Sequence, residues 1–121
     1  MFISNTGELL GVHRKLVPTW AEKLTWGAGD GSSVKVYDTD IGKFGGLICG
    51  ENTNPLARFS LLAQGEDIHV ASYIAQPVGP EGWDMIEGIK IRAAAHSLEG
   101  KVFTLVSSSV ITEEIIDKVA P

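Results

Sequence analysis

The segment spanning residues 42–59 constrains the fold most, because its pattern changes from strand to helix around a single cysteine. The apolar run Phe44–Ile48 lies between glycines, which predicts a short strand that other backbones approach closely. Asn54 and Pro55 then predict the beginning of a helix, with Asn as the N-cap and Pro at the first helical position. Cys49 lies between these two elements, at a turn that lifts a thiol clear of a sheet and near helix N–H groups that favour a thiolate. A buried structural cysteine is the alternative interpretation, since free cysteine is among the most buried residue types.

Two hairpins come first in the chain, and strands then alternate with helices. The expected elements are strands Phe2–Ile3 and Leu9–Leu16, strands Val34–Tyr37 and Lys43–Cys49, a helix from Pro55 to Gly65, a strand over Ile68–Ile74, a helix over Trp83–Leu98, a strand over Lys101–Ser107 and a helix capped by Thr112. The inward faces of the first two helices are expected to carry Leu56, Phe59, Leu62 and Ala63, and Met85, Ile86, Ile89 and Ala93. This order of elements predicts an α/β protein with a mixed sheet.

The composition excludes several classes of function. A chain of 121 residues forms at most one domain. Its single cysteine makes neither an internal disulfide nor a metal cluster, so we expect no metal, no other cofactor and a reducing, cytoplasmic setting. The net charge of −5 argues against a nucleic-acid partner, which requires clustered Lys and Arg. No apolar run approaches the ~20 residues of a membrane helix, so no membrane partner is expected.

The two ends of the chain are expected to leave sheet edges unpaired. The chain begins directly in a strand, and it ends on Ala120 and Pro121. Intact domains avoid unpaired sheet edges and exposed apolar faces. We therefore expect residues 1–121 to be a single incomplete domain that lacks its N- and C-terminal parts, and we expect the isolated chain to aggregate.

Three ionisable residues form a candidate catalytic set: Cys49, Lys15 and Glu22. A thiolate attacks an electrophilic carbon, a lysine ammonium stabilises the negative charge that develops, and a carboxylate near the lysine holds it oriented. Spacing alone does not bring the three together, although strand ends on neighbouring strands would. The three histidines of the chain are each expected to pack or form hydrogen bonds, and Glu51 and Arg58 are candidates for an ion pair near the turn.

Three segments of the chain resemble characteristic segments of nitrilases, in the carbon–nitrogen hydrolase superfamily. Residues 11–24 (GVHRKLVPTWAEKL) with 29–31 resemble the lysine segment, residues 47–52 (LICGEN) resemble the nucleophile segment, and residues 96–103 (HSLEGKVF) resemble a third block. Their order and spacing agree with the family, and the similarity covers nearly the whole chain. The forms HRKLVPT and GENTN are more similar to arylacetonitrilases than to amidases or carbamoylases.

The resemblance implies a four-layer α-β-β-α sandwich and a Glu-Lys-Cys catalytic set. Cys49 would attack the nitrile carbon to give a thioimidate, Lys15 would stabilise the tetrahedral species, and the backbone N–H of Gly50 would act as an oxyanion donor. Glu22 matches the additional glutamate that positions the lysine. Water would then release ammonia and a carboxylic acid. The expected substrate contacts are Glu51, Asn52 and Tyr73, and the expected assembly of the full-length protein is a homo-oligomer or helical filament.

Two departures from the family pattern stand out. The general-base glutamate of the family lies upstream of the lysine segment, the chain begins after its expected position, and Glu8 does not match its motif. Gly50 stands where many relatives carry Trp or Tyr, which predicts an altered pocket. The favoured function is therefore an aryl or arylaliphatic nitrilase whose fragment alone is inactive. The alternatives are a cyanide hydratase or amidase variant, and a truncated, non-catalytic chain that associates with full-length relatives.

Overall fold

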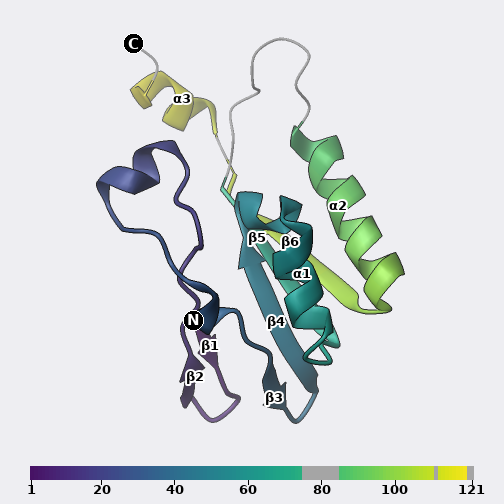
Figure 1. Cartoon of the computed structure of the whole chain (residues 1–121). Coiled ribbons are helices and arrows are strands. Elements are labelled where there is room, and N and C mark those ends of the chain that lie inside the picture. The colour runs from purple at the N-terminus through teal and green to yellow at the C-terminus, as the bar shows by residue number, and fades with distance from the viewer. Residues whose placement is uncertain (75–84, 111, 120–121) are drawn as a thin grey trace.

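The computed structural model describes residues 1–74, 85–110 and 112–119 (Figure 1). The strands within these ranges are β1 (Phe2–Ile3), β2 (Leu9–Gly11), β3 (Tyr37–Thr39), β4 (Gly42–Ile48), β5 (Ile68–Tyr73) and β6 (Phe103–Ser108). The α-helices are α1 (Pro55–Leu62), α2 (Met85–Gly100) and α3 (Glu113–Val119). Three short 3-10 helices complete the set: η1 (Trp20–Leu24), η2 (Gly31–Ser33) and η3 (Cys49–Thr53).

A four-stranded sheet with the order β3-β4-β5-β6 forms the centre of the chain (Figure 1). Strands β3 and β4 form an antiparallel hairpin, whereas β4, β5 and β6 run parallel to one another. The prediction of a mixed sheet in an α/β protein is therefore confirmed. Crossovers between parallel strands are right-handed, so successive crossovers in one direction place α1 and α2 on the same face of the sheet. A groove lined by residues of both helices is consistent with that arrangement.

The helix-covered face of the sheet carries the buried residues. Leu47 of β4 packs with Val34 and with Ala57 and Leu61 of α1, and Leu61 is fully buried. The glycines of β4 serve close packing, as expected: a Cβ at Gly46 would lie 2.8 Å from the backbone oxygen of Val70.

The opposite face of the sheet is apolar and partly uncovered. Phe44, Ile68 and Phe103 lie in register across β4, β5 and β6, and Val70 and Leu105 are paired two residues further along. Phe103 is 77% exposed and Leu105 is 55% exposed. In a sandwich this is the kind of face on which a second sheet packs.

Several predicted details of the elements are wrong. The second strand ends at Gly11 rather than Leu16, because the following residues make side-chain contacts instead of continuing the ladder. The inward face of α1 is formed by Ala57 and Leu61, whereas Leu56 and Phe59 are exposed. Apolar residues occur on all sides of this helix, so the periodicity of its sequence does not distinguish the buried face from the exposed face.

Two further predictions about the elements are wrong. Ile86 of α2, expected to face inward, is 64% exposed. The first strand of the second hairpin begins at Tyr37 rather than Val34, because Val34 instead packs in the core. The predicted loop over residues 76–82 and the predicted helix start at Trp83 lie outside the described residues.

Candidate active site

Cys49 lies at a sharp turn between β4 and a helical segment, as predicted. Its backbone has φ of +52°, in a region that costs a non-glycine residue about 1–3 kcal/mol and that persists where the surroundings enforce it. The side chain is buried and packs against Ala71 and Tyr73 of β5. Beyond η3, the side chain of Asn54 accepts hydrogen bonds from the N–H groups of Leu56 and Ala57, which confirms the predicted N-cap of α1.

Lys15 is buried and makes an ion pair with Glu22. Its Nζ donates to Oε2 of Glu22 at 2.5 Å and to Oγ1 of Thr19 at 3.0 Å, and only 3% of the residue is exposed. The backbone N–H of Thr19 donates to the same carboxylate oxygen. Burial acts to raise the pKa of Glu22, but the hydrogen bonds from Lys15 and Thr19 prevail and lower it. Glu22 is thus an ionised partner that fixes the direction of the lysine ammonium.

The glycine-rich segment after η1 packs against the lysine segment. The N–H of Gly29 donates to the carbonyl oxygen of Lys15 at 2.8 Å. A Cβ at Gly29 would meet the backbone oxygen of Arg14 at a separation too short for real atoms, so only glycine fits. Gly29 therefore supports the backbone of Lys15.

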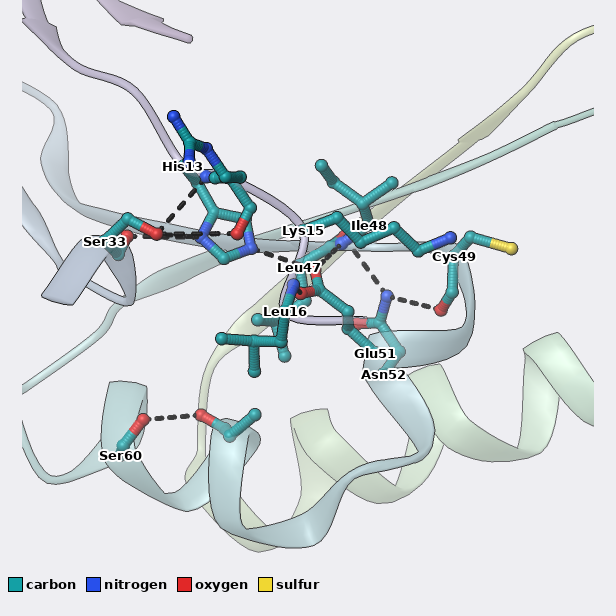
Figure 2. A network of polar contacts seen from close by, with 12 residues as sticks. His13, Lys15, Leu16, Ser33, Leu47, Ile48, Cys49, Glu51, Asn52 and Ser60 are labelled. Carbon is teal, nitrogen blue, oxygen red and sulfur yellow. Dashed lines mark hydrogen bonds and ion pairs between the residues drawn. The ribbon is translucent and has the colours of Figure 1, made fainter. Parts of the chain in front are cut away.

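Glu51 connects the lysine segment to the cysteine turn (Figure 2). One carboxylate oxygen accepts from the backbone N–H of Leu16 at 2.5 Å, and the other accepts from the N–H of Ile48 at 2.8 Å and from Nε2 of His13 at 2.9 Å. Leu16 directly follows Lys15 and Ile48 directly precedes Cys49, so one buried carboxylate holds the two segments together. Figure 2 shows the Lys15 side chain extending toward Cys49.

His13 and Glu51 each favour the charged form of the other. The hydrogen bond that His13 donates to Glu51 raises the pKa of His13, and this effect exceeds the opposing effect of burial. Burial acts to raise the pKa of Glu51, but the hydrogen bonds from His13, Leu16 and Ile48 prevail and lower it. The predicted ion pair between Glu51 and Arg58 is wrong: Arg58 Nη1 instead lies 3.8 Å from Glu99.

The three expected substrate contacts differ in their surroundings. Both oxygens of Glu51 and the amide of Asn52 are occupied by protein groups; Nδ2 of Asn52 donates to the carbonyl oxygens of Leu47 at 3.2 Å and Cys49 at 3.1 Å. These contacts suit a role in shaping the turn better than a direct contact with substrate. Tyr73 lies against Cys49, and burial raises the pKa of its phenol while the charge of Arg92 acts in the opposite direction.

Gly50 is exposed, and a Cβ built on it has no heavy atom within 4 Å. Its N–H lies in the first turn of η3, where helical N–H groups lack acceptors within the helix. The turn therefore leaves open space at Gly50, the residue after the cysteine, where a larger side chain would fit.

The sequence pattern does not predict one buried cluster, which is formed by Glu66, His69 and His96. Nδ1 of His69 lies 2.8 Å from Oε1 of Glu66, and Nε2 of His96 lies 2.9 Å from Oε2. The hydrogen-bonding role expected of these histidines is confirmed, as it is for His13. Their partner Glu66 is 30 residues from His96, and local pattern carries no signal for so distant a pairing.

The ligand atoms of this cluster lie within 4.8 Å of one another, a spacing that a metal ion can bridge. The same atoms are joined directly by hydrogen bonds, and Nε2 of His69 is engaged by Asn52. Hydrogen bonds among these atoms thus account for their close spacing without a metal ion. Within the described ranges, no helix is both long and apolar enough to cross a membrane.

These features define an α/β protein with a candidate cysteine nucleophile at a strand-to-helix turn and a buried lysine–glutamate pair beside it. A family model described as "Carbon-nitrogen hydrolase" matches residues 1–119. The chain belongs to this family.

Curated nitrilases are among its relatives. The chain is 38% identical over 122 residues to "Nitrilase" of Bacillus sp. (strain OxB-1), which covers 98% of this chain and 35% of the relative. It is 42% identical over 99 residues to "Nitrilase 3" of an unknown prokaryotic organism, which covers 82% of this chain and 29% of the relative. It is 52% identical over 71 residues to "Nitrilase 2" of Arabidopsis thaliana, which covers 59% of this chain and 21% of the relative. The chain thus spans about a third or less of the length of these relatives.

Two solved structures share the fold. A carbon-nitrogen hydrolase from Helicobacter pylori G27 matches with a TM-score of 0.71 at 20% identity, over 97% of this chain and 42% of the other. Saccharomyces cerevisiae Nit3, a member of branch 10 of the nitrilase superfamily, matches with a TM-score of 0.67 at 21% identity, over 89% of this chain and 37% of the other. These matches confirm the expected fold class, that of the nitrilase-type α-β-β-α sandwich.

Proposed function

We propose that this chain carries the nucleophile and lysine segments of a nitrilase that hydrolyses an aryl or arylaliphatic nitrile to a carboxylic acid and ammonia. The observation that carries the proposal is the carboxylate of Glu51, which joins the backbone next to Lys15 to the backbone next to Cys49. Similarity to curated nitrilases over up to 98% of the chain supports the same conclusion. The aryl preference rests on the HRKLVPT and GENTN segments, and the single cysteine favours a reducing, cytoplasmic setting.

The proposed reaction begins with attack of the Cys49 sulfur on the nitrile carbon. A carbon–sulfur bond forms, the nitrile nitrogen takes up a proton, and the product is a thioimidate. Water then adds to the thioimidate carbon, and ammonia leaves to give a thioester. A second water molecule releases the carboxylic acid and regenerates the thiol.

Lys15 is assigned to the negative charge that develops in these steps. A buried ammonium oriented by Glu22 and Thr19 stabilises such charge without reorganising. The backbone N–H of Gly50, in the first turn of η3, is assigned as a second donor. Glu22 is assigned as a positioning residue because its carboxylate is engaged by the lysine segment. Tyr73 is assigned to the pocket wall, since it packs against Cys49. Glu51 and Asn52 are assigned to shaping the turn.

The general base is not assigned to Glu8, which is exposed in the turn between β1 and β2. We propose that residues 1–121 form one part of a longer catalytic domain, in keeping with the share of each relative that the chain covers. The chain alone is therefore expected to release no ammonia from nitriles.

A chimera tests this proposal. The chain replaces the matching segment of the Bacillus nitrilase, about a third of that protein, so that the host supplies the remainder of the domain. The folded chimera is expected to release ammonia from phenylacetonitrile or benzonitrile, and Cys49→Ala and Lys15→Ala are expected to abolish release. A folded chimera that releases no ammonia from a panel of aryl and aliphatic nitriles would contradict the proposal. Amide as the main product would point instead to a hydratase, and turnover of amides alone to an amidase.

A second candidate function is association without catalysis. It is favoured by the uncovered apolar face of the sheet, where Phe103 and Leu105 are exposed, and by the exposed Leu56 and Phe59 on α1. The proposed partner is a full-length relative or a second copy, and the full-length protein is proposed to form homo-oligomers or filaments. Co-elution of the chain with the Bacillus nitrilase in size-exclusion chromatography tests this function, and strictly separate elution counts against it.

A further inference from the structure

His13 lies between two groups of contacts that hold the lysine segment, and the proposed chemistry does not use it. The ladder of β2 ends at Gly11, so residues 13–16 have no strand partner in the sheets that the structure describes. Their backbone polar groups must find partners elsewhere. On one side these partners come from the loop that contains η2, and on the other side they come from Glu51.

The loop that contains η2 contacts three successive residues of the lysine segment. Oγ of Ser33 accepts from the backbone N–H of Arg14 at 3.2 Å. Nδ1 of His13 lies 3.2 Å from the carbonyl oxygen of Ser33 and 3.1 Å from its Oγ (Figure 2). The N–H of Gly29 donates to the carbonyl oxygen of Lys15 at 2.8 Å. The loop therefore fixes the position of this irregular stretch of backbone.

The other ring nitrogen of His13 faces the bridging carboxylate. Nε2 lies 2.9 Å from Oε2 of Glu51, and the two side chains are 5% and 3% exposed. The two oxygens of Glu51 also accept from the backbone N–H groups of Leu16 and Ile48. Glu51 therefore acts as an acceptor toward three donors, and His13 is the side chain among them.

These contacts are satisfied at either charge of the His13 ring. A doubly protonated ring donates from Nδ1 to the carbonyl oxygen of Ser33 and from Nε2 to Glu51. A neutral ring with its hydrogen on Nε2 still donates to Glu51, and its Nδ1 accepts from the hydroxyl of Ser33. In both arrangements the ring donates to Glu51 and Ser33 fixes the direction of the ring.

We propose that His13, held in place by Ser33, is a positioning residue that acts through Glu51. The carboxylate of Glu51 sets the spacing of Lys15 and Cys49, because it accepts from the backbone N–H group next to each of them. Errors in such spacing are costly, since a displacement of about 1 Å can lower a rate about 10²-fold. The inference rests on the roles proposed for Lys15 and Cys49.

Two amide substitutions separate the two contacts of His13. In His13→Gln, the amide nitrogen reaches the place of Nε2, so the donor to Glu51 is kept and the contact with Ser33 is lost. In His13→Asn, the amide nitrogen takes the place of Nδ1, so the contact with Ser33 is kept and the donor to Glu51 is lost. Both variants are made in the chimera with the Bacillus nitrilase, because the isolated chain is expected to aggregate.

A chemical probe reports the proximity of Lys15 and Cys49 without a nitrile. The reagent o-phthalaldehyde joins a thiol and an amine into a fluorescent isoindole only where the two lie close together, and peptide mapping locates the product. Lys15→Met and Cys49→Ala chimeras identify the isoindole of this pair. Its formation is expected to be about tenfold slower in His13→Asn than in wild type, the factor that one hydrogen bond to a charged group corresponds to. In His13→Gln it is expected to be only about twofold slower.

Three results would overturn the proposal: equal rates in His13→Asn and His13→Gln, a His13→Asn rate equal to that of wild type, or a wild-type chimera that forms no isoindole. Equal rates would mean that the donor to Glu51 has no particular role. The absence of isoindole in wild type would mean that the bridge does not bring Lys15 and Cys49 together.

Ser33→Ala decides the question where His13→Asn does not fold. This change removes the hydroxyl and leaves the carbonyl group, so isoindole formation is expected to be about twofold slower than in wild type. Ser33→Thr keeps the hydroxyl and should react at the wild-type rate. Ser32→Ala is the matched control, because the side chain of Ser32 contacts Asp30 instead, and it should also react at the wild-type rate. A Ser33→Ala rate equal to that of Ser32→Ala would overturn the proposal.

Turnover of phenylacetonitrile separates this proposal from the nitrilase assignment. In His13→Asn, kcat is expected to fall about tenfold with little change in KM, because His13 orients groups of the site without touching the substrate. A chimera that forms the isoindole at the expected relative rates but releases no ammonia contradicts the nitrilase assignment and supports the positioning role. A chimera that releases ammonia while its His13 variants form the isoindole at equal rates overturns the positioning role alone.

Discussion

Replacing Glu51 with Gln tests how strongly one buried carboxylate holds the two candidate catalytic segments together. The change keeps the shape of the side chain but leaves one acceptor oxygen where the carboxylate has two. If the amide oxygen takes the place of Oε2, it still accepts from His13 and Ile48. The amide NH₂ then faces the N–H of Leu16, and two donors oppose each other in a buried site.

The structure gives a magnitude for this change. An unsatisfied buried donor costs about 1–3 kcal/mol. The two remaining hydrogen bonds lose the assistance of the carboxylate charge, worth roughly 1 kcal/mol each. We therefore expect Glu51→Gln to lower the free energy of unfolding by about 3–5 kcal/mol, a large part of the roughly 5–15 kcal/mol typical of a domain.

Each variant is made in the chimera with the Bacillus nitrilase, because the isolated chain is expected to aggregate. Urea denaturation of the chimera followed by far-UV circular dichroism measures the effect, at protein concentrations where the midpoint does not depend on concentration. Glu99→Gln is the matched control, because Glu99 is exposed and lies 3.8 Å from Arg58. The control should change the free energy of unfolding by less than about 0.5 kcal/mol. A Glu51→Gln midpoint as close to wild type as that of the control, with an unchanged slope, would refute the bridging role of Glu51.

Three further predictions follow from the same contacts. The hydrogen bond that His13 donates to Glu51 raises the pKa of His13 above its ordinary value of about 6.5. The stability from this pair is therefore fully present below that pH and is lost as pH rises through the raised pKa. Urea midpoints measured between about pH 6 and pH 9 should therefore fall in wild type and stay flatter in His13→Gln. Gly45→Ala should lower the free energy of unfolding by about 1–3 kcal/mol in the same assay, because the new Cβ would lie 2.1 Å from Oε1 of the fully buried Glu66. Glu22→Gln in the chimeric nitrilase should lower kcat by about 10²-fold with little change in KM, because the ammonium of Lys15 loses the carboxylate that orients it. Ammonia release measures both constants.

The local features of the fold were predictable because each depends on neighbouring residues. The N-cap at Asn54 and the sharp turn at Cys49 follow from residues adjacent in sequence. The mixed sheet follows from the order of strands and helices. The boundary of β2 was missed because the residues from His13 onward read as a strand, although they serve side-chain contacts with distant partners such as Glu51.

The long-range polar contacts were beyond reach of the sequence pattern. Glu51 was matched with Arg58 because the two are close in sequence, but its partner His13 is 38 residues away. Glu66 read as an ordinary polar residue after a helix, although β4, β5 and α2 enclose it between two histidines. Helix α1 shows the same limit for apolar residues, since Leu56 and Leu61 look equally suited to a core.

The central claim is that Cys49 is the nucleophile, and the most direct measurement is intact-protein mass spectrometry of the chimera. The chimera is mixed with an aryl nitrile and quenched in acid at early times. The account predicts a transient adduct heavier by the mass of the nitrile, followed by one of the corresponding thioester, both localised to Cys49 by peptide mapping and absent from Cys49→Ala. Release of ammonia with no adduct at Cys49, or release that persists in Cys49→Ala, would contradict the account.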